Sequence, residues 1–297
     1  MPRPSFTRWF SYLFSALAIG TVMMMVLLLV VQSLPVWQKE GLGFITGTKW
    51  FYRNEQFGAA PMILGTVLTA FTALLFTAPI GIGAAIFTSE FLHPRFRLGV
   101  KIVIELLAGV PSVVYGLLGI LFLRNWIYDL LTPFDPLSGD TLLTGAVLLA
   151  VMILPTVMTL ADDALRSVTA AQRLAARGLG LTSTEVVLHV SLPQSARGLG
   201  AALLLGLGRA LGEAIAVFLV IGRQDNQWPS KLFSIQSLIE PGQSLSTKLA
   251  SSEANIAYGN ALHWGAICGI ALVLMLMVAG ITLTSAFLQH LSRRHAP

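Results

Sequence analysis

Six long apolar runs, separated by short polar segments, dominate the pattern along the chain. They occupy residues 11–34, 60–88, 98–122, 141–161, 198–222 and 262–288. Each provides the roughly 20 helical residues that are needed to cross about 30 Å of hydrocarbon. Strand-type alternation of apolar and polar positions is absent, which argues against a transmembrane β-barrel. The pattern therefore predicts an all-α integral membrane protein with six transmembrane helices.

Composition and charge support this prediction. Hydrophobic residues make up 55% of the 297 residues and charged residues only 11%, which is too apolar for a soluble domain of this length. The net charge of +5 is explained by topology, because the side that holds both termini collects more Lys and Arg than the other. We therefore expect a multi-pass membrane protein with both termini cytoplasmic. The basic residues placed inside are Arg3, Arg8, Arg95, Arg97, Lys101, Arg166, Arg173, Arg177, Arg197, Arg293 and Arg294.

A polar segment of about thirty residues, 162–194, separates the fourth and fifth apolar runs. Residues 164–178 have the spacing of an amphipathic helix, and TSTE at 182–185 is a capping sequence for a second short helix. Gly180 permits a tight turn between them, and Pro193 is suited to begin the next helix. We expect an elbow of two short helices that faces the cytosol.

The elbow resembles the cytoplasmic coupling loop of ABC importer permeases. That pattern is Glu-Ala-Ala, three residues, Gly, nine residues, Ile, one residue and Leu-Pro. The matching positions are Leu174, Ala175, Ala176, Gly180, Val190, Leu192 and Pro193. The resemblance implies that the segment docks on an ATPase and transmits its closure. Leu174 replaces the usual Glu, so coupling here is expected to rely more on apolar docking; the alternative is an ordinary surface loop.

Two charges lie deep in the fifth apolar run, within GLGRALGEAIAV at 206–217. Arg209 and Glu213 are four residues apart and are expected on one helix face, where burial in lipid would be costly. In the functional interpretation Arg209 offers a planar guanidinium to an oxyanion while Glu213 holds it. In the structural interpretation they are an ion pair that joins helices. Gly208 and Gly212 form a GxxxG pair that is expected to let another helix approach.

A third charge, Glu105, precedes LLAGVPSVVYG in the third run. It is a candidate partner of Arg209 or of Lys101, or a wetted residue near the cytoplasmic interface. Pro111 is expected to kink this helix.

The wider pattern resembles the permease subunits of phosphate ABC importers, closer to the C-type than to the A-type. The resemblance rests on GAAPMILGTVLTAF, PIGIGAAIFTSEF, IELLAGVPSVVYGLLG, GLGRALGEAIAV and SLSTKLASSEANIAYG. It implies a type I importer permease of the MetI-like fold, with the first helix and flanks at 1–40 and the permease core at 58–290. It also implies a substrate path through Arg209, Glu213 and Glu105. The implied partners are a second (PstA-like) permease, two ATP-binding subunits, an extracytoplasmic phosphate-binding protein and the phosphate ion. The implied location is the bacterial inner membrane.

Other motifs are missing. The chain has no GxxxxGK[ST] sequence, so ATP hydrolysis is expected in a partner and this chain is not expected to be an enzyme. Five His and the single Cys268 show no ligand-type spacing, so neither a metal nor a cofactor is expected. Three alternatives stay open: a permease for sulfate or molybdate, a transport-incompetent membrane adaptor for phosphate signalling, and a proton-coupled carrier.

Overall fold

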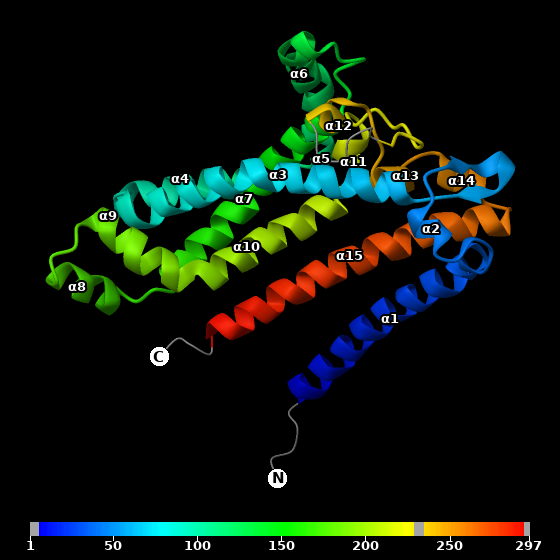
Figure 1. Ribbon diagram of the computed structural model, residues 1–297. Coiled ribbons are helices and arrows are strands. Elements are labelled where there is room, and N and C mark those ends of the chain that lie inside the picture. Colours follow the sequence, from blue (N-terminus) through cyan, green and yellow to red (C-terminus); the bar gives the residue numbers. More distant parts are fainter. Residues whose placement is uncertain (1–5, 229–234, 294–297) are drawn as a thin grey trace. The chain divides into compact units, whose positions relative to one another are not determined.

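The computed structural model describes residues 6–228 and 235–293, and these form helices almost throughout (Figure 1). Arg3 and Arg294, which the topology prediction counts as cytoplasmic, lie outside the described residues. The chain divides into two compact units. One comprises the chain up to Ala60 together with Ser252–Val273, and the other comprises Pro61–Ser251 and the chain from Leu274 onward.

The first unit combines a long helix with a small hairpin. Its elements are α1 (Phe6–Glu40), α2 (Gly43–Thr46), β1 (Trp50–Phe51), a 3₁₀ turn (Tyr52–Asn54), β2 (Gln56–Phe57), α14 (Glu253–Ala257) and the start of α15 (Ala261–Arg293). The two strands pair antiparallel. Buried His263 lies 2.9 Å from Glu253 Oε1, which also accepts the Trp50 indole N–H at 2.5 Å. These polar contacts join the hairpin to α14 and α15.

The second unit is built around α7. Its elements are α3 (Ala60–Ile86), α4 (Pro94–Ala108), α5 (Ser112–Leu118), α6 (Arg124–Leu131), a 3₁₀ turn (Thr132–Phe134), α7 (Leu142–Arg166), α8 (Ala170–Gly178), α9 (Ser183–Val186), α10 (Leu192–Gly212), α11 (Ile215–Phe218), α12 (Ile235–Ile239), α13 (Leu245–Leu249) and the rest of α15. π-helical turns occupy Phe87–Phe91, Gly119–Leu123 and Val187–Ser191. Leu149 and Ile153 of α7 pack with Ala70 of α3 and with Leu207 and Leu211 of α10.

Small residues let α7 and α10 approach closely. A Cβ atom on Gly206 would lie 2.5 Å from Val157 Cγ2, and one on Gly198 would lie 2.8 Å from Ala164 Cβ. The expected GxxxG pair is different, because a Cβ on Gly208 would make only ordinary contacts and Gly212 borders open space. The close approach therefore depends on Gly206, two residues before Gly208, and on Gly198, rather than on the predicted pair.

Five described helices are long and apolar enough to cross a membrane. They span Arg8–Glu40, Ala60–Phe91, Ser112–Phe134, Leu142–Arg166 and Ala261–His290. Four of them match the predicted first, second, fourth and sixth runs. The predicted fifth run corresponds to α10 with α11, so a total of six crossings stays a prediction.

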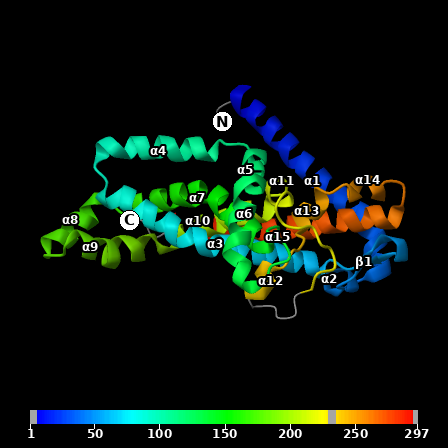
Figure 2. The ribbon, with the colours of Figure 1, turned by 90° about the horizontal axis from the view of Figure 1, so that it is seen from above.

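The predicted third crossing, 98–122, is wrong in position. The chain breaks at Gly109–Pro111, which leaves α4 as a separate helix that meets α5 at a sharp corner (Figure 2). Pro111 lacks an N–H group and disfavours helical backbone in the residue before it, so a full break replaces the expected kink. Tyr115 donates its hydroxyl hydrogen to the carbonyl of Leu107 at 2.9 Å, across the break.

Candidate functional site

The fifth apolar run breaks where its charges lie. Helix α10 ends at Gly212, Glu213 has extended backbone (φ −75°, ψ 119°), and α11 begins at Ile215. The prediction that Arg209 and Glu213 share one helix face is therefore wrong in this conformation. The physical reason is local, because Gly is among the poorest helix formers and Ser246 donates its hydroxyl hydrogen to the Glu213 carbonyl at 2.9 Å.

Arg209 lies in the last turn of α10 with its side chain exposed. Its Nη1 donates to Thr156 Oγ1 of α7 at 2.5 Å. Within residues 6–228 and 235–293 no carboxylate pairs with it. A guanidinium has five N–H donors, so most donors of Arg209 face outward from this unit and are available to an acceptor.

Glu213 caps α11 in this conformation. Its carboxylate accepts the N–H of Ala216 at 3.4 Å, and so satisfies a donor at the start of that helix. Beside it lies a cavity of about 10 Å³, with room for roughly one water molecule. The polar side chains that line the cavity with Glu213 are Thr66, Thr69, Ser244 and Ser246.

The segment Gln243–Lys248, part of the loop after the fifth run, is buried beside this break. Thr66 Oγ1 of α3 accepts the N–H of Leu245 at 2.8 Å, which ties the segment to α3. Lys248 is 1% exposed, and its ammonium lies 2.6 Å from Asp225 Oδ2. The sequence analysis counted Lys248 only as an outer-loop charge, and its burial depends on a tertiary contact that the hydropathy pattern does not contain.

Two of the most distinctive motifs meet at the break. Gly116 of PSVVYG packs on α11, so closely that a Cβ there would lie 2.6 Å from Leu219 Cδ1 and 3.0 Å from Ala216 Cα. Only glycine permits this contact between α5 and α11. The geometry gives these two motifs a common role, which is to hold the broken fifth helix in place.

Glu105 is not brought to this site. Its side chain is 60% exposed on α4, and Lys101 Nζ lies 3.9 Å from its Oε1 one turn earlier. No contact with Arg209 or Glu213 occurs among the described residues. Of the two candidate partners, the structure pairs Glu105 with Lys101.

The predicted elbow is present and forms the far end of the second unit from α11–α13 (Figure 1). Helix α8 is followed by Gly180 at φ +92°, a backbone conformation that favours glycine. Thr182 and Glu185 form the predicted capping box at the start of α9. Hydrogen bonds from the backbone and side chain of Thr182 lower the pKa of Glu185, because they favour the carboxylate form that closes the box.

The end of the elbow agrees with the prediction in part. Pro193 is the second residue of α10, as expected near a helix start, but α9 runs through the π-helical turn Val187–Ser191 directly into α10. The Leu192 N–H bonds the Val187 carbonyl five residues earlier, and Val190 lies within this turn. A proline removes a helical donor and crowds the preceding turn, and the wider π turn relieves both effects.

The elbow presents apolar side chains outward. Leu174 is 64% exposed, Leu179 83% and Leu188 53%. Ala175 is also exposed, whereas Ala176 is buried. Exposed leucines grouped on one short segment are typical of a docking surface.

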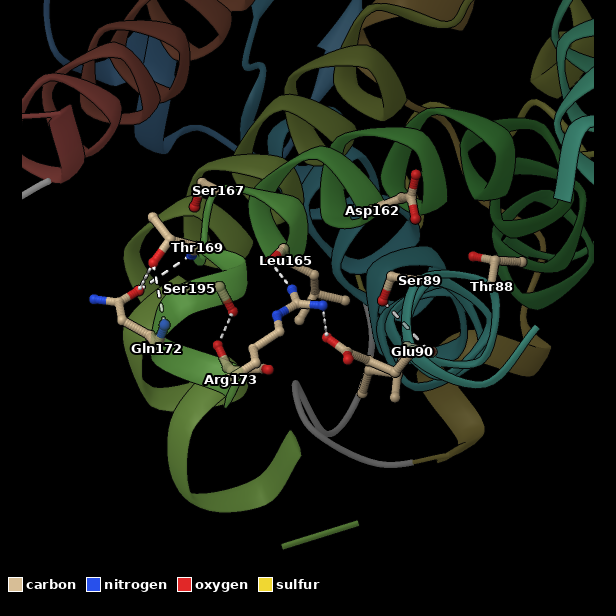
Figure 3. Close-up of polar contacts among 12 residues, drawn as sticks. Thr88, Ser89, Glu90, Asp162, Leu165, Ser167, Thr169, Gln172, Arg173 and Ser195 are labelled. Carbon is tan, nitrogen blue, oxygen red and sulfur yellow. Dashed lines mark hydrogen bonds and ion pairs between the residues drawn. The ribbon is translucent and has the colours of Figure 1, made fainter. Parts of the chain in front are cut away.

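Arg173 anchors the elbow to the rest of the second unit. Its Nη1 lies 2.9 Å from Glu90 Oε1 in the turn that ends α3, and its Nη2 donates to the Leu165 carbonyl at 2.8 Å (Figure 3). The pair is largely buried, with side chains 19% and 6% exposed. Thr169 and Gln172 form a second capping box at the start of α8, also drawn in Figure 3. The sequence analysis missed both features.

Comparison with known proteins identifies the family. Residues 77–296 match the model of the binding-protein-dependent transport system inner membrane component. The chain belongs to this family. It is therefore a membrane component of a transporter and not an enzyme, as expected.

Curated relatives and solved structures agree with this assignment. The phosphate transport system permease protein PstC of Mesorhizobium japonicum is 33% identical over 80% of this chain and 75% of its own length. PstC of Pasteurella multocida is 34% identical over 95% and 89%. The match to a chain in the crystal structure of a bacterial alginate ABC transporter with its periplasmic protein covers 95% of this chain and 94% of that one, with 16% identity and a TM-score of 0.58. A chain of the inward-facing MetNI methionine transporter covers 77% and 92%, with 16% identity and a TM-score of 0.55. The ABC importer permease fold that the sequence predicts is confirmed.

Proposed function

We propose that this chain forms half of the transmembrane path of an ATP-driven importer for inorganic phosphate. The observation that carries the proposal is Arg209, an arginine without a carboxylate partner among the described residues, at the end of an apolar helix. Relatives that are named phosphate transport system permease proteins support phosphate as the substrate. A guanidinium suits this ion, because its planar donors match two oxygens of one oxyanion.

In this proposal Arg209 contacts the anion, and the break at Glu213 shapes the site. Thr156 orients the guanidinium from α7. Glu213 holds α11 through Ala216, and its negative charge limits how strongly the anion is retained. This negative charge therefore favours passage of the anion over tight binding. Glu105 lies outside this site and acts at most on access from one side.

The partners and topology follow from the same proposal. Both termini lie in the cytoplasm, and the elbow docks on one of two ATP-binding subunits through Leu174 and its exposed neighbours. A second, PstA-like permease supplies the other half of the path. An extracytoplasmic phosphate-binding protein delivers the ion on the opposite side of the membrane. ATPase closure moves the elbow, and Arg173 transmits the movement to α3 through Glu90.

Uptake by the reconstituted importer tests the proposal. The chain is purified with the subunits that accompany it in mild detergent, placed in vesicles and supplied with ATP and the binding protein. Labelled phosphate is expected to accumulate, and excess sulfate or molybdate is expected not to compete. Competition by sulfate or molybdate at equal concentration would reassign the substrate. ATP-independent uptake that follows a proton gradient would overturn the importer assignment.

A further inference from the structure

Three arginines surround a cavity of about 220 Å³ at the base of the elbow. They come from three elements that converge there: Arg97 from α4, Arg166 from the end of α7 and Arg173 from α8. The other lining residues are small or apolar, and no carboxylate lines the cavity itself. They are Ser89, Val168 and Ala170.

The protein neutralises these arginines only in part. Asp162 pairs with Arg166 at 2.7 Å and with Arg97 at 3.4 Å, and Glu90 pairs with Arg173. Three cations thus share two carboxylates. Most of their N–H donors have no acceptor among the described residues, and the Nε–H groups of Arg97 and Arg173 are buried without one. Buried unsatisfied donors are unfavourable, so the arrangement lacks an anion with several acceptor oxygens.

We propose that this cavity binds a phosphate group at the cytoplasmic face, carried either by an anionic phospholipid or by free inorganic phosphate. Both sources offer tetrahedral oxygens to converging guanidinium groups. Arg97 and Arg166 also border a small adjoining cavity of about 20 Å³, where Val100, Ile104 and Met158 offer apolar contacts beside Lys101 and Asp162. These apolar contacts favour a lipid source, because the carbon atoms next to a lipid headgroup can pack on them. The site is separate from Arg209 and does not rest on the proposed transport role.

Two substitutions test the site in opposite ways. The double variant Arg97→Gln/Arg166→Gln removes two charges but keeps side-chain length. Ala170→Asp retains every arginine and adds a competing carboxylate at the cavity wall. Residue 170 is the first of α8, where an acidic side chain favours the helix, so this variant is expected to fold. Arg177→Gln, an exposed α8 position that does not line the cavity, is the matched control.

Two arms distinguish the source of the phosphate group, both with the full chain and its partner subunits in nanodiscs. The lipid arm uses phosphatidylcholine with a minority of phosphatidylglycerol, and native mass spectrometry counts retained phosphatidylglycerol. The phosphate arm uses phosphatidylcholine alone in an Arg209→Ala background, and calorimetry follows titration with inorganic phosphate.

We expect binding in one arm, about tenfold weaker in both test variants and unchanged in Arg177→Gln. Retention of phosphatidylglycerol alone identifies a lipid headgroup, and calorimetric binding alone identifies the free ion. Binding of neither by the unsubstituted chain, or equal binding by that chain and both test variants, overturns the proposal. Uptake measurements do not enter this result, so failure here leaves the transport role unaffected.

Discussion

At the scale of single residues, Arg209 is the sharpest test of the substrate path. Arg209→Ala removes the donors that we assign to the anion, and loss of one charged hydrogen-bonding group lowers uptake by roughly 10- to 100-fold. Arg209→Lys is expected to recover little, because an ammonium cannot make the two parallel bonds of a guanidinium. Uptake of labelled phosphate into reconstituted vesicles measures both variants.

The control is Thr156→Val, which removes the hydroxyl that accepts from Arg209 but leaves its charge. A moderate loss is expected, since the guanidinium is then less well oriented. Full uptake by an assembled Arg209→Ala importer would exclude this arginine from the path.

Glu213 is expected to behave as a capping residue as well as a charge. Glu213→Gln keeps an oxygen that accepts the Ala216 N–H, whereas Glu213→Ala leaves that donor unsatisfied at a cost of about 1 kcal/mol. The thermal unfolding midpoint in detergent should therefore fall for Ala and stay near the unsubstituted value for Gln. Equal midpoints for all three chains would show that the capping bond contributes nothing to stability.

At the scale of elements, the turn at Gly180 should set the geometry of coupling. A β-branched residue at φ +92° is strained, and left-handed backbone costs an ordinary residue about 1–2 kcal/mol. Gly180→Val should therefore displace α8 relative to α9 and weaken the stimulation of ATP hydrolysis by loaded binding protein in vesicles. Gly178→Ala is the control, because its Cβ also meets open space but its φ is not positive. If both variants are stimulated normally, the elbow is an ordinary loop.

The pair between Arg173 and Glu90 gives a second test at this scale. Arg173→Glu places two carboxylates together, and Glu90→Arg places two cations together, so each should uncouple ATP hydrolysis from uptake. The exchange of both charges in one chain should restore part of the coupling, because the pair is re-formed in reverse. The ratio of phosphate transported to ATP hydrolysed is the measurement. Additive losses in the exchanged chain would show that the two side chains act independently.

The elbow was predictable because its signals are local. Thr182 and Glu185 cap α9 three residues apart, and the turn requires a glycine at a defined position, so neighbouring residues alone indicate both. Pro111 was predicted to kink its helix but not to break it, and the break at Glu213 was missed, because hydropathy continues through both positions. Gly206 was missed as a contact because its partner, Val157, lies far away in the sequence. The anchor at Arg173 depends likewise on a distant Glu90.

At the scale of the whole molecule, the proposed path requires a second subunit, because Arg209 is exposed in this chain. The chain has one cysteine, Cys268, and a Cys268→Ser background therefore allows single-cysteine labelling. If the proposed path forms only on assembly, a cysteine at position 209 meets lipid in the chain alone, where a thiol neither ionises nor reaches a water-soluble reagent. In the assembled importer it would border the polar path. A charged methanethiosulfonate should therefore label it only after assembly.

Two controls set the range of this measurement. Phe71→Cys lies on an exposed apolar face of α3 and should stay unlabelled in both states, and Leu137→Cys, 84% exposed in the loop before α7, should react in both. Phosphate should also slow labelling at position 209 if the anion occupies the same space. Equal labelling of position 209 with and without the partner would mean that this chain forms its polar path by itself. Because the guanidinium already lies at the surface of its unit, we expect the dependence on the partner to be large.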